Sequence, residues 1–214
     1  MRSYSQYCSV AKALDVIGDR WNLLIVRELL LRGRSRYTDL HKGLPGIATN
    51  LLAERLRELE EAGVVLREQA PPPIATTLYS LTVRGQELES VIYELGRWGA
   101  PLMRDRDAND VFQSHWLWMP VKLFLSDRAP DEPPLAIQVE SEGEPMVIEA
   151  QDGDLQIRPG QVDRPDATLS GPLQVLLALF GGELNLAQAR RQGLRYKGDA
   201  AILERLLPRE PVLA

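Results

Sequence analysis

The segment from Tyr37 to Thr82 constrains the fold of this chain more than any other part of the sequence. A short helical pattern leads into the turn Leu44-Pro45-Gly46-Ile47, and an amphipathic helix follows that ends at Gly63. Two short strands come next, Val64–Glu68 and Thr77–Val83, and prolines between them withhold backbone donors at the tip. The sequence therefore predicts two helices joined by a tight turn, with a β-hairpin behind them.

The amphipathic helix carries different chemistry on its two faces. Its apolar stripe repeats at spacings of four and three residues and must be buried: Leu52, Leu56 and Leu59. Asn50, Ala53 and Arg57 share the face turned away from this stripe, and Thr49 lies at the N-terminal end. Helix, turn, helix, hairpin is the order of a winged helix-turn-helix, whose second helix enters the DNA major groove. The pattern therefore indicates a DNA-binding regulator.

A small set of side chains is predicted to contact double-stranded DNA: Arg36, Thr49, Asn50, Arg57 and Arg67. Arginine suits phosphate contact, and the amide of Asn50 can read an adenine edge. Arg67 is the only cationic residue of the hairpin. Glu54 also points outward and repels phosphate, so it must face a base edge or lie off the DNA.

Charge is divided unequally along the chain. Residues 1–106 hold 15 Lys or Arg and 13 Asp or Glu, a net of +2, whereas residues 107–214 hold 10 and 17, a net of −7. A positive excess on the helix-turn-helix suits phosphate contact, although a solvated surface gives similar counts. The charged break at 104–110 is the predicted boundary between two domains, 1–106 and 107–214.

Helical periodicity places the other helices of the first domain. They are expected at Ser9–Ile17, Trp21–Leu31, Tyr37–Lys42 and, as one long helix, Gln86–Met103. The long helix is amphipathic but has little left to cover in so small a domain. We expect it to pair with its copy in a homodimer, together with the first helix.

Beyond the break the pattern changes to that of an α+β domain. The Trp-rich segment 115–125 is expected to be helical. Strands are expected at Leu135–Glu140, Pro145–Glu149, Leu155–Arg158, Ala167–Ser170 and Leu194–Tyr196, and helices at Leu173–Phe180, Leu186–Arg191 and Ala200–Leu207. The predicted fold class is thus multidomain α+β, a winged helix-turn-helix followed by a domain of helices and a sheet.

From Cys8 to about Leu88 the chain resembles the HxlR-type winged-helix transcriptional regulators, which are related to the MarR group. The ordered matches are Cys8, Gly18-Asp19-Arg20-Trp21, Gly33-Arg34-Ser35-Arg36-Tyr37, Leu44-Pro45-Gly46-Ile47, Leu56-Arg57-Glu58-Leu59-Glu60 with Gly63, and Tyr79-Ser80-Leu81-Thr82 with Gly85. The resemblance implies a homodimer that binds an inverted repeat, usually to repress nearby genes. Ala48 and Asn50 replace the serine and lysine common in the family, which weakens phosphate contact.

Cys8 aligns with a cysteine that some members of this family use as an oxidation sensor. A reactive thiol needs exposure and a lowered pKa. Lys12, one helical turn away, favours a lowered pKa, and Asp15 opposes it. The alternative is a cysteine tucked under the dimer helices.

Residues from about Asp163 to Leu207 resemble a sterol-carrier-protein-like domain. The matching residues are Arg164-Pro165-Asp166-Ala167-Thr168-Leu169, the helix Leu173–Phe180 with Gly181-Gly182-Glu183-Leu184, and Leu194-Arg195-Tyr196-Lys197-Gly198-Asp199. The resemblance implies a sheet covered by helices, often enclosing an apolar tunnel for lipid-like ligands. The predicted pocket for a hydrophobic small-molecule effector consists of Trp116, Trp118, Leu123, Phe124, Leu176, Leu179 and Phe180. The same stripes also fit a plain core.

Other classes of protein find little support in the sequence. No apolar run approaches the roughly 18 residues of a spanning helix, and the N-terminus lacks the apolar segment of a signal peptide. One cysteine cannot form an internal disulfide, so we expect a cytoplasmic protein without membrane contact. His41 and His115 are the only histidines, and turn chemistry explains Asp152-Gly153-Asp154, so no metal site is expected. Without a phosphate loop or a base–nucleophile pair, neither a cofactor nor catalysis is expected.

The predicted function is therefore a dimeric transcriptional regulator, a repressor by its resemblance, with an apolar effector as the expected ligand of the second domain. The alternative is a lipid-binding or carrier protein whose winged helix is a scaffold or a protein-interaction module. Specific DNA binding at physiological salt distinguishes the two.

Overall fold

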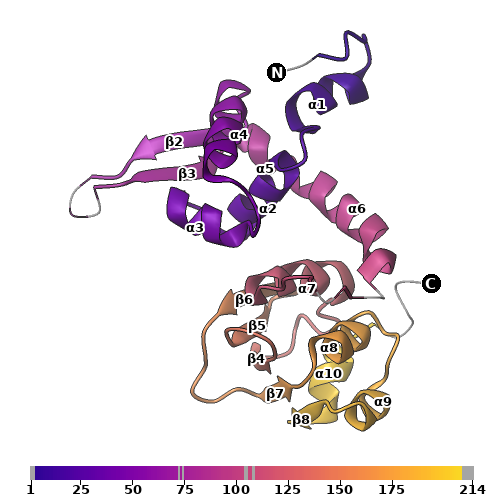
Figure 1. Cartoon of the computed structure of the whole chain (residues 1–214). Coiled ribbons are helices and arrows are strands. Elements are labelled where there is room, and N and C mark those ends of the chain that lie inside the picture. Colours follow the sequence, from indigo (N-terminus) through magenta and orange to yellow (C-terminus); the bar gives the residue numbers. More distant parts are fainter. Residues whose placement is uncertain (1–2, 72, 74, 104–105, 108, 209–214) are drawn as a thin grey trace. The chain divides into compact units, whose positions relative to one another are not determined.

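The computed structural model describes residues 3–71, 73, 75–103, 106–107 and 109–208. The chain forms two compact units, Met1–Leu95 (unit 1) and Gly96–Ala214 (unit 2), whose elements are labelled in Figure 1. The domain boundary expected at residues 106 and 107 stays a prediction. Residues 104, 105 and 108 of the charged break lie outside the described residues.

Up to the predicted long helix, which is described below, unit 1 contains the predicted helices and hairpin. Its elements are α1 (Ser9–Ile17), α2 (Asn22–Arg32), β1 (Ser35–Arg36), α3 (Tyr37–Gly43), α4 (Thr49–Glu61), β2 (Val65–Gln69), β3 (Thr77–Leu81) and α5 (Val83–Gln86). Helix α1 has the predicted bounds, and those of α2, α3 and the hairpin strands differ by one or two residues. Gly46 in the turn before α4 and Gly63 after it have φ of 87° and 70°. Such left-handed backbone suits glycine, so these two residues fix where α4 begins and ends.

The hairpin is part of a three-stranded antiparallel sheet of order β1-β3-β2. Tyr79 on the central strand pairs with Ser35 on one side and with Arg67 on the other. Strand β1 is only two residues long, and the sequence pattern did not predict it. It joins the start of α3 to the hairpin and so helps to orient the helix-turn-helix against the wing.

A carboxylate is buried in the core of unit 1. Glu28 on α2 is 0% exposed, and its two oxygens accept hydrogen bonds from Arg27 and Arg32, each at 2.9 Å. Gly43, the last residue of α3, packs against it so closely that an added Cβ would lie 2.2 Å from Glu28 Oε2. The ion pairs of Glu28 lie within α2, and the absence of a side chain at Gly43 is what lets α3 pack closely against the buried carboxylate.

The long helix expected over Gln86–Met103 is wrong as a single element. The structure has α5, then α6 (Glu89–Gly99), then a 3-10 turn, η1 (Ala100–Met103). Thr82 starts α5 early, because its hydroxyl accepts a hydrogen bond from the backbone N–H of Gly85 at 3.0 Å. Pro101 has no N–H to donate to the carbonyl four residues before it, so α-helical geometry stops at Gly99.

The Trp-rich segment is helical but also divided. It forms a 3-10 turn, η2 (Ser114–Leu117), and then α7 (Trp118–Phe124). Pro120 has no N–H for the carbonyl of Trp116, so no α-helical hydrogen bond joins these two residues. The N–H of Trp116 itself donates to the carbonyl of Gln113 at 2.9 Å, a bond of the 3-10 type. The missing donor explains why the first turn is wound more tightly than the rest.

Unit 2 is built on a five-stranded mixed sheet of order β6-β5-β4-β7-β8. The strands are β4 (Leu135–Glu140), β5 (Met146–Gln151), β6 (Asp154–Pro159), β7 (Ala167–Ser170) and β8 (Arg195–Lys197). Only the β4–β7 pair is parallel among these neighbours. Asp152 and Gly153 have φ of 51° and 84°, as a tight hairpin between β5 and β6 requires. Turn chemistry therefore accounts for this aspartate, as predicted.

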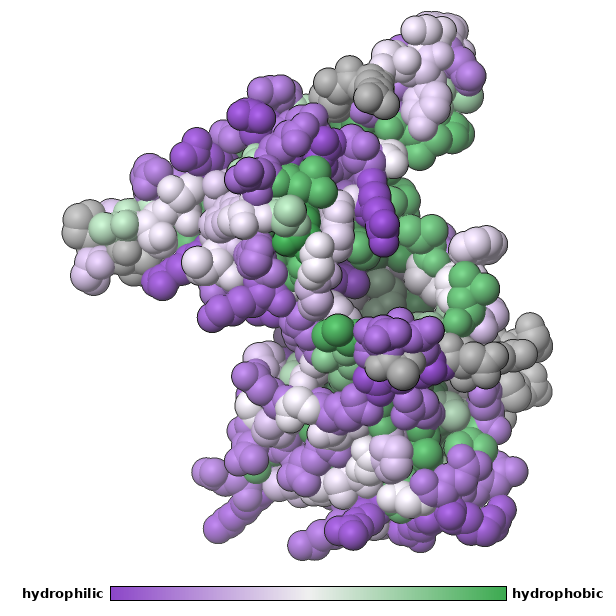
Figure 2. Space-filling view, viewed as in Figure 1, coloured by the Kyte–Doolittle hydropathy of each residue, from purple (hydrophilic) through white to green (hydrophobic). Residues whose placement is uncertain are grey.

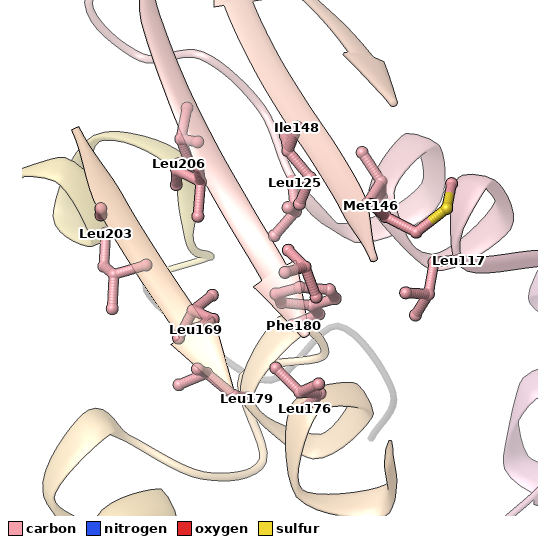
Figure 3. Packing of buried hydrophobic residues seen from close by; sticks show 14 of the residues in the cluster. Leu117, Leu125, Met146, Ile148, Leu169, Leu176, Leu179, Phe180, Leu203 and Leu206 are labelled. Atoms are coloured by element: carbon pink, nitrogen blue, oxygen red, sulfur yellow. The ribbon is translucent and has the colours of Figure 1, made fainter. Parts of the chain in front are cut away.

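The helices around the sheet of unit 2 include η2, α7, α8 (Leu173–Phe180), α9 (Leu186–Arg191) and α10 (Ala200–Leu206), and the last three agree with the predictions to within one residue. Their apolar side chains and those of the strands form one core. Figure 3 shows Phe180 of α8 among packed side chains from the sheet, η2, α8 and α10. Unit 2 is therefore an α+β domain, in which helices and a sheet share one core.

A second buried ion pair anchors the C-terminal helix of unit 2. Arg205 on α10 binds Asp127 with two hydrogen bonds, Nε to Oδ1 at 2.7 Å and Nη2 to Oδ2 at 2.8 Å. Its third nitrogen donates to the carbonyl of Pro133 at 2.9 Å. The hydrogen bond from Arg205 is the main reason why the pKa of Asp127 is lowered. The pair connects α10 to the loop between α7 and β4.

Candidate nucleic-acid interface

Helix α4 has the two faces that the sequence predicts. Leu52, Leu56 and Leu59 are buried, whereas Asn50 and Arg57 are exposed. The buried stripe fixes the rotation of the helix about its own axis. The polar residues of the opposite face are thereby presented to solvent, where a DNA groove is accessible to them.

The start of α4 is held by a residue that sequence reasoning missed. The hydroxyl of Tyr37 on α3 donates to the carbonyl of Thr49 at 2.6 Å, and its ring stacks with that of His41 at 6.4 Å between centroids. Burial raises the pKa of Tyr37, so the hydroxyl stays protonated and able to donate. Ala48, at the N-cap, has no side chain that caps α4. Tyr37 therefore supports a helix start that lacks the usual capping side chain.

The remaining predicted DNA contacts lie on the sheet and beside α3. Arg67 is exposed on β2, and Arg36 is exposed at the end of β1, directly before Tyr37. Because Ser35, Tyr79 and Arg67 pair across the three strands, Arg36 and Arg67 lie about two strand spacings apart, roughly 10 Å. The structure thus brings Arg36 near the start of α4 through Tyr37, and it places Arg67 on the wing. DNA contact by these residues stays a prediction.

Two cations near the predicted set are engaged within the protein. Arg34 pairs with Glu68 of β2 at 2.8 Å across the base of the wing. Arg55 of α4 is 13% exposed and pairs with Asp19, Glu54 and Glu58. Neither arginine belongs to the predicted DNA contacts. The partner Asp19 lies 36 residues away in the sequence, so no local pattern could have revealed it.

Cys8 is exposed at the N-cap of α1. Backbone N–H groups of Ala11 and then Val10 lower the pKa of its thiol. Both properties are those that a reactive thiol requires. The alternative of a cysteine covered by dimer helices involves a second copy of the chain, and oxidation sensing stays a prediction.

Large apolar side chains are exposed on two helices, as Figure 2 shows over α1 and α6. They are Val10 and Leu14 of α1 and Val91, Leu95 and Trp98 of α6, and Trp98 is 73% exposed. The α6 residues recur at spacings of four and three and therefore share one face. Contiguous exposed apolar surface of this kind is typical of an interaction site.

The residues predicted to line a ligand pocket differ in their burial. Leu176, Leu179 and Phe180 are buried in the core of unit 2, Phe124 packs against that core, and Trp116, Trp118 and Leu123 are half-buried. A cleft of about 630 Å³ lies elsewhere in unit 2, between the α8–α9 connection and α10, and of the predicted residues only Leu179 lines it. Its other apolar lining includes Leu184, Leu186, Leu203 and Leu207. The pocket residues stay a prediction, and the cleft is a site that the sequence did not indicate.

Two further observations concern other kinds of site. Within the part of the chain that the structure describes, no three His, Cys, Asp or Glu side chains are grouped so that they could bind a metal ion. None of the described helices combines the length and the apolar composition that a membrane span requires.

A buried leucine stripe, an exposed polar face and an adjoining two-stranded wing define a winged helix-turn-helix protein. Comparison with known sequences gives the family. Residues 16–107 match the model of the HxlR-like helix-turn-helix, and the chain belongs to this family of DNA-binding transcriptional regulators. The resemblance predicted from the sequence is confirmed.

Relatives with known sequences include two proteins of Bacillus subtilis. The uncharacterized HTH-type transcriptional regulator YvaP is 39% identical over 87 residues, which cover 41% of this chain and 80% of YvaP. The HTH-type transcriptional regulator YodB is 36% identical over 86 residues, covering 40% of this chain and 76% of YodB. The crystal structure of diamide-treated YodB from B. subtilis is 33% identical in sequence to this chain, with a TM-score of 0.39. The match covers 45% of this chain and 95% of that chain. These similarities concern the N-terminal part of the chain.

The C-terminal part has its own family match. Residues 132–207 match the model of the SCP-2 sterol transfer family. The match extends from just before β4 to the end of α10 and so includes the whole sheet of unit 2. The sterol-carrier-like resemblance is confirmed, and it joins a second kind of domain to the regulator.

Proposed function

We propose that this protein is a homodimeric repressor that binds an inverted repeat and responds to an apolar small molecule. The observation that carries the proposal is α4, a helix with a buried leucine stripe and an exposed polar face beside a wing. In a dimer, two such helices enter successive major grooves about one helical turn apart. A regulator of this kind works at the chromosome, which supports the predicted cytoplasmic location.

The exposed faces of α1 and α6 support the dimer. They carry the apolar residues described above, and a second copy of the chain buries the same surface on both partners. We expect α6 to pair with its copy because its exposed face continues over two helical turns, from Val91 to Trp98. Repression and the inverted repeat are carried over from the family resemblance.

The proposed DNA contacts are Arg36, Thr49, Asn50, Arg57 and Arg67. Arg57 is assigned to phosphate, because it is an exposed cation at the middle of α4. Asn50 is assigned to a base edge, because it lies in the first turn of the helix, where base contacts concentrate. Thr49 lies beside it, and Arg67 reaches the backbone from the wing.

Variants of α4 test this assignment. Arg57→Ala is expected to weaken binding to every sequence and to reduce the salt slope by about 1, since one phosphate contact is lost. Asn50→Ala is expected to cost about 1 to 3 kcal/mol on the preferred sequence only. Fluorescence anisotropy on DNA from upstream of the gene and on a shuffled fragment, at two salt concentrations, measures both effects.

Arg84→Ala provides the matched control, because Arg84 is an exposed cation of unit 1 on α5, outside the proposed contacts. It is expected to bind like the parent. The docking of α4 is refuted if Arg57→Ala and Asn50→Ala also bind like the parent. Parent protein that prefers neither fragment would favour the carrier function instead.

A second candidate function, lipid binding or carriage, is favoured by the cleft of unit 2 and by the SCP-2 match. Its lining is mostly apolar, with Arg128, Asn185 and Glu204 as polar members. A cleft of about 630 Å³ has the size of a small-molecule site. The same cleft serves either the effector of a regulator or the cargo of a carrier.

A fluorescent fatty acid tests ligand binding at this cleft. Ala187→Trp narrows the cleft from an exposed position and is expected to weaken binding of the probe by about tenfold or more. Ala201→Trp adds the same bulk at an exposed position of α10 that does not line the cleft, and it should bind like the parent. Equal affinity of all three proteins would place the probe elsewhere. If the bound probe also changes the affinity of the protein for DNA, the cleft is an effector site. If it does not, the carrier function is favoured.

A further inference from the structure

Arg55 is a cation of α4 that faces the protein rather than the solvent. Its side chain is 13% exposed, and two of its three carboxylate partners, Glu54 at 3.0 Å and Glu58 at 2.7 Å, belong to α4 itself. The third partner, Asp19, follows α1 in the connection to α2. The Asp19–Arg55 ion pair therefore ties the middle of α4 to the end of α1.

The two kinds of contact constrain α4 differently. The leucine stripe fixes which face of α4 is buried, but apolar contacts are non-directional and tolerate small changes of tilt. A guanidinium presents its donors in a rigid planar fork, and it binds a carboxylate in a defined geometry. The ion pair thus adds a directional restraint between α4 and α1, two helices that also pack against each other.

We propose that the Asp19–Arg55 ion pair sets the separation of the two recognition helices in the dimer and thereby selects the spacing of the DNA half-sites. The inference rests on the proposed function, in which α1 belongs to the dimer interface and α4 enters the groove. Half-sites are read together only when the recognition helices match their separation, about 34 Å for one helical turn. Arg55 is then a positioning residue for operator spacing and makes no contact with DNA.

Asp19→Asn removes an exposed carboxylate and leaves Arg55 paired with Glu54 and Glu58, so its effect on stability should be small. Asp19 is 59% exposed, and exposed ion pairs contribute little to folding. Asp19→Asn should therefore fold and melt like the parent, while its recognition helices vary in separation. Because Arg55 touches no phosphate, the salt slope should also stay unchanged, in contrast to that of Arg57→Ala.

Selection from a random duplex library tests the inference for operators of any sequence. The parent is expected to enrich inverted repeats of one spacing, whereas Asp19→Asn and Arg55→Lys enrich the same half-site at several spacings. On synthetic duplexes, each protein's affinity for the parent's preferred spacing is divided by its affinity for a spacing that is two base pairs longer. For Asp19→Asn and Arg55→Lys this ratio should be at least about fivefold lower than for the parent. Glu58→Gln is the control, because it removes a carboxylate from the same guanidinium within α4 and leaves Asp19 in place. It should keep the parent's spacing.

The outcomes separate the inference from the function on which it rests. A parent that enriches no inverted repeat would overturn the proposed function, and the inference with it. If the parent prefers one spacing and Asp19→Asn and Arg55→Lys prefer the same one as strongly, the inference is overturned and the proposed function stands. Loss of spacing preference in Glu58→Gln as well would assign the effect to the charge of α4 and contradict the link to α1.

Distances between spin labels provide a second test that needs no DNA. Cys8 is the only cysteine, so Cys8→Ser with Glu61→Cys places one label per chain at the exposed end of α4. A dimer should give one narrow distance distribution, and Asp19→Asn should widen it. Unchanged width would contradict the inference, and absence of any coupling in the parent would contradict the dimer.

Discussion

Replacement of Glu28 by alanine is expected to lower the free energy of unfolding of unit 1 by about 3 to 5 kcal/mol. The carboxylate is fully buried, and its removal leaves Arg27 and Arg32, 20% and 31% exposed, without their buried counter-charge. A domain of this size is stabilised by only about 5 to 15 kcal/mol, so the loss is a large fraction of the total. Hydrogen exchange in increasing urea, followed by mass spectrometry of the full chain, measures each unit separately.

Glu68→Gln is the matched control for Glu28. Glu68 pairs with Arg34 at 2.8 Å, nearly the same distance, but the two side chains are 43% and 59% exposed. Its loss should cost less than about 1 kcal/mol. A Glu28→Ala protein as stable as Glu68→Gln would show that the buried carboxylate does not stabilise the helix-turn-helix.

Gly43 offers a sharper version of the same test. Alanine in place of a helical glycine usually stabilises a helix by up to about 1 kcal/mol. At Gly43 the new Cβ would meet the Glu28 carboxylate, so we expect Gly43→Ala to destabilise unit 1. The same change made in Glu28→Ala should cost much less, because the clashing group is gone. Additive effects of the two changes would contradict this account.

In unit 2, Asp127→Asn is expected to cost about 3 kcal/mol at neutral pH, since it breaks a buried pair with two hydrogen bonds. The pKa of Asp127 is lowered in the folded state, first of all by the Arg205 hydrogen bond. Its contribution is therefore complete above the unfolded pKa of about 3.9 and is lost as pH falls through the lower, folded pKa. The stability of the parent should fall in that acidic range more steeply than that of Asp127→Asn.

Urea titrations from pH 7 to pH 2 measure this difference. Glu149→Gln is the control, because Glu149 also accepts two hydrogen bonds from one arginine, Arg158, but both side chains are largely exposed. It should cost less than about 1 kcal/mol. The ion pair is not a stabilising one if Asp127→Asn and the parent keep the same stability difference at every pH.

Elements that are bounded by local chemistry could be predicted from the sequence. Helix α1 ends at Gly18, and α8 ends at the glycines after Phe180, so their bounds follow from neighbouring residues. The single helix predicted over Gln86–Met103 was wrong because apolar periodicity continues across the separate elements. Thr82 caps an earlier helix, α5, and Pro101 ends α-helical geometry after α6. Strand β1 is too short to carry any periodicity.

For the candidate interface, the sequence predicted which face of α4 is buried and which is exposed. Periodicity identified the buried leucines of α4 and the exposed Asn50 and Arg57. It could not identify partners that are distant in the sequence, such as Asp19 for Arg55. It placed a helix over Trp21–Leu31 but did not indicate that the single carboxylate within it is buried against arginines. Pairing between residues far apart in the sequence, as between Asp19 and Arg55, leaves no regular spacing, and burial of a charge is decided by the packing of other elements.

The order of strands in unit 2 has a consequence for synthesis. Strand β8 completes the sheet beside β7 and lies late in the chain, just before α10, so this sheet cannot close until residues near 200 have left the ribosome. The sheet of unit 1 is complete by Leu81. At translation rates of about 5 to 20 residues per second, the interval is roughly 6 to 24 seconds. We expect nascent chains to carry a folded winged helix while the sterol-carrier-like domain is still being made, which sets the order of folding from the first domain to the second.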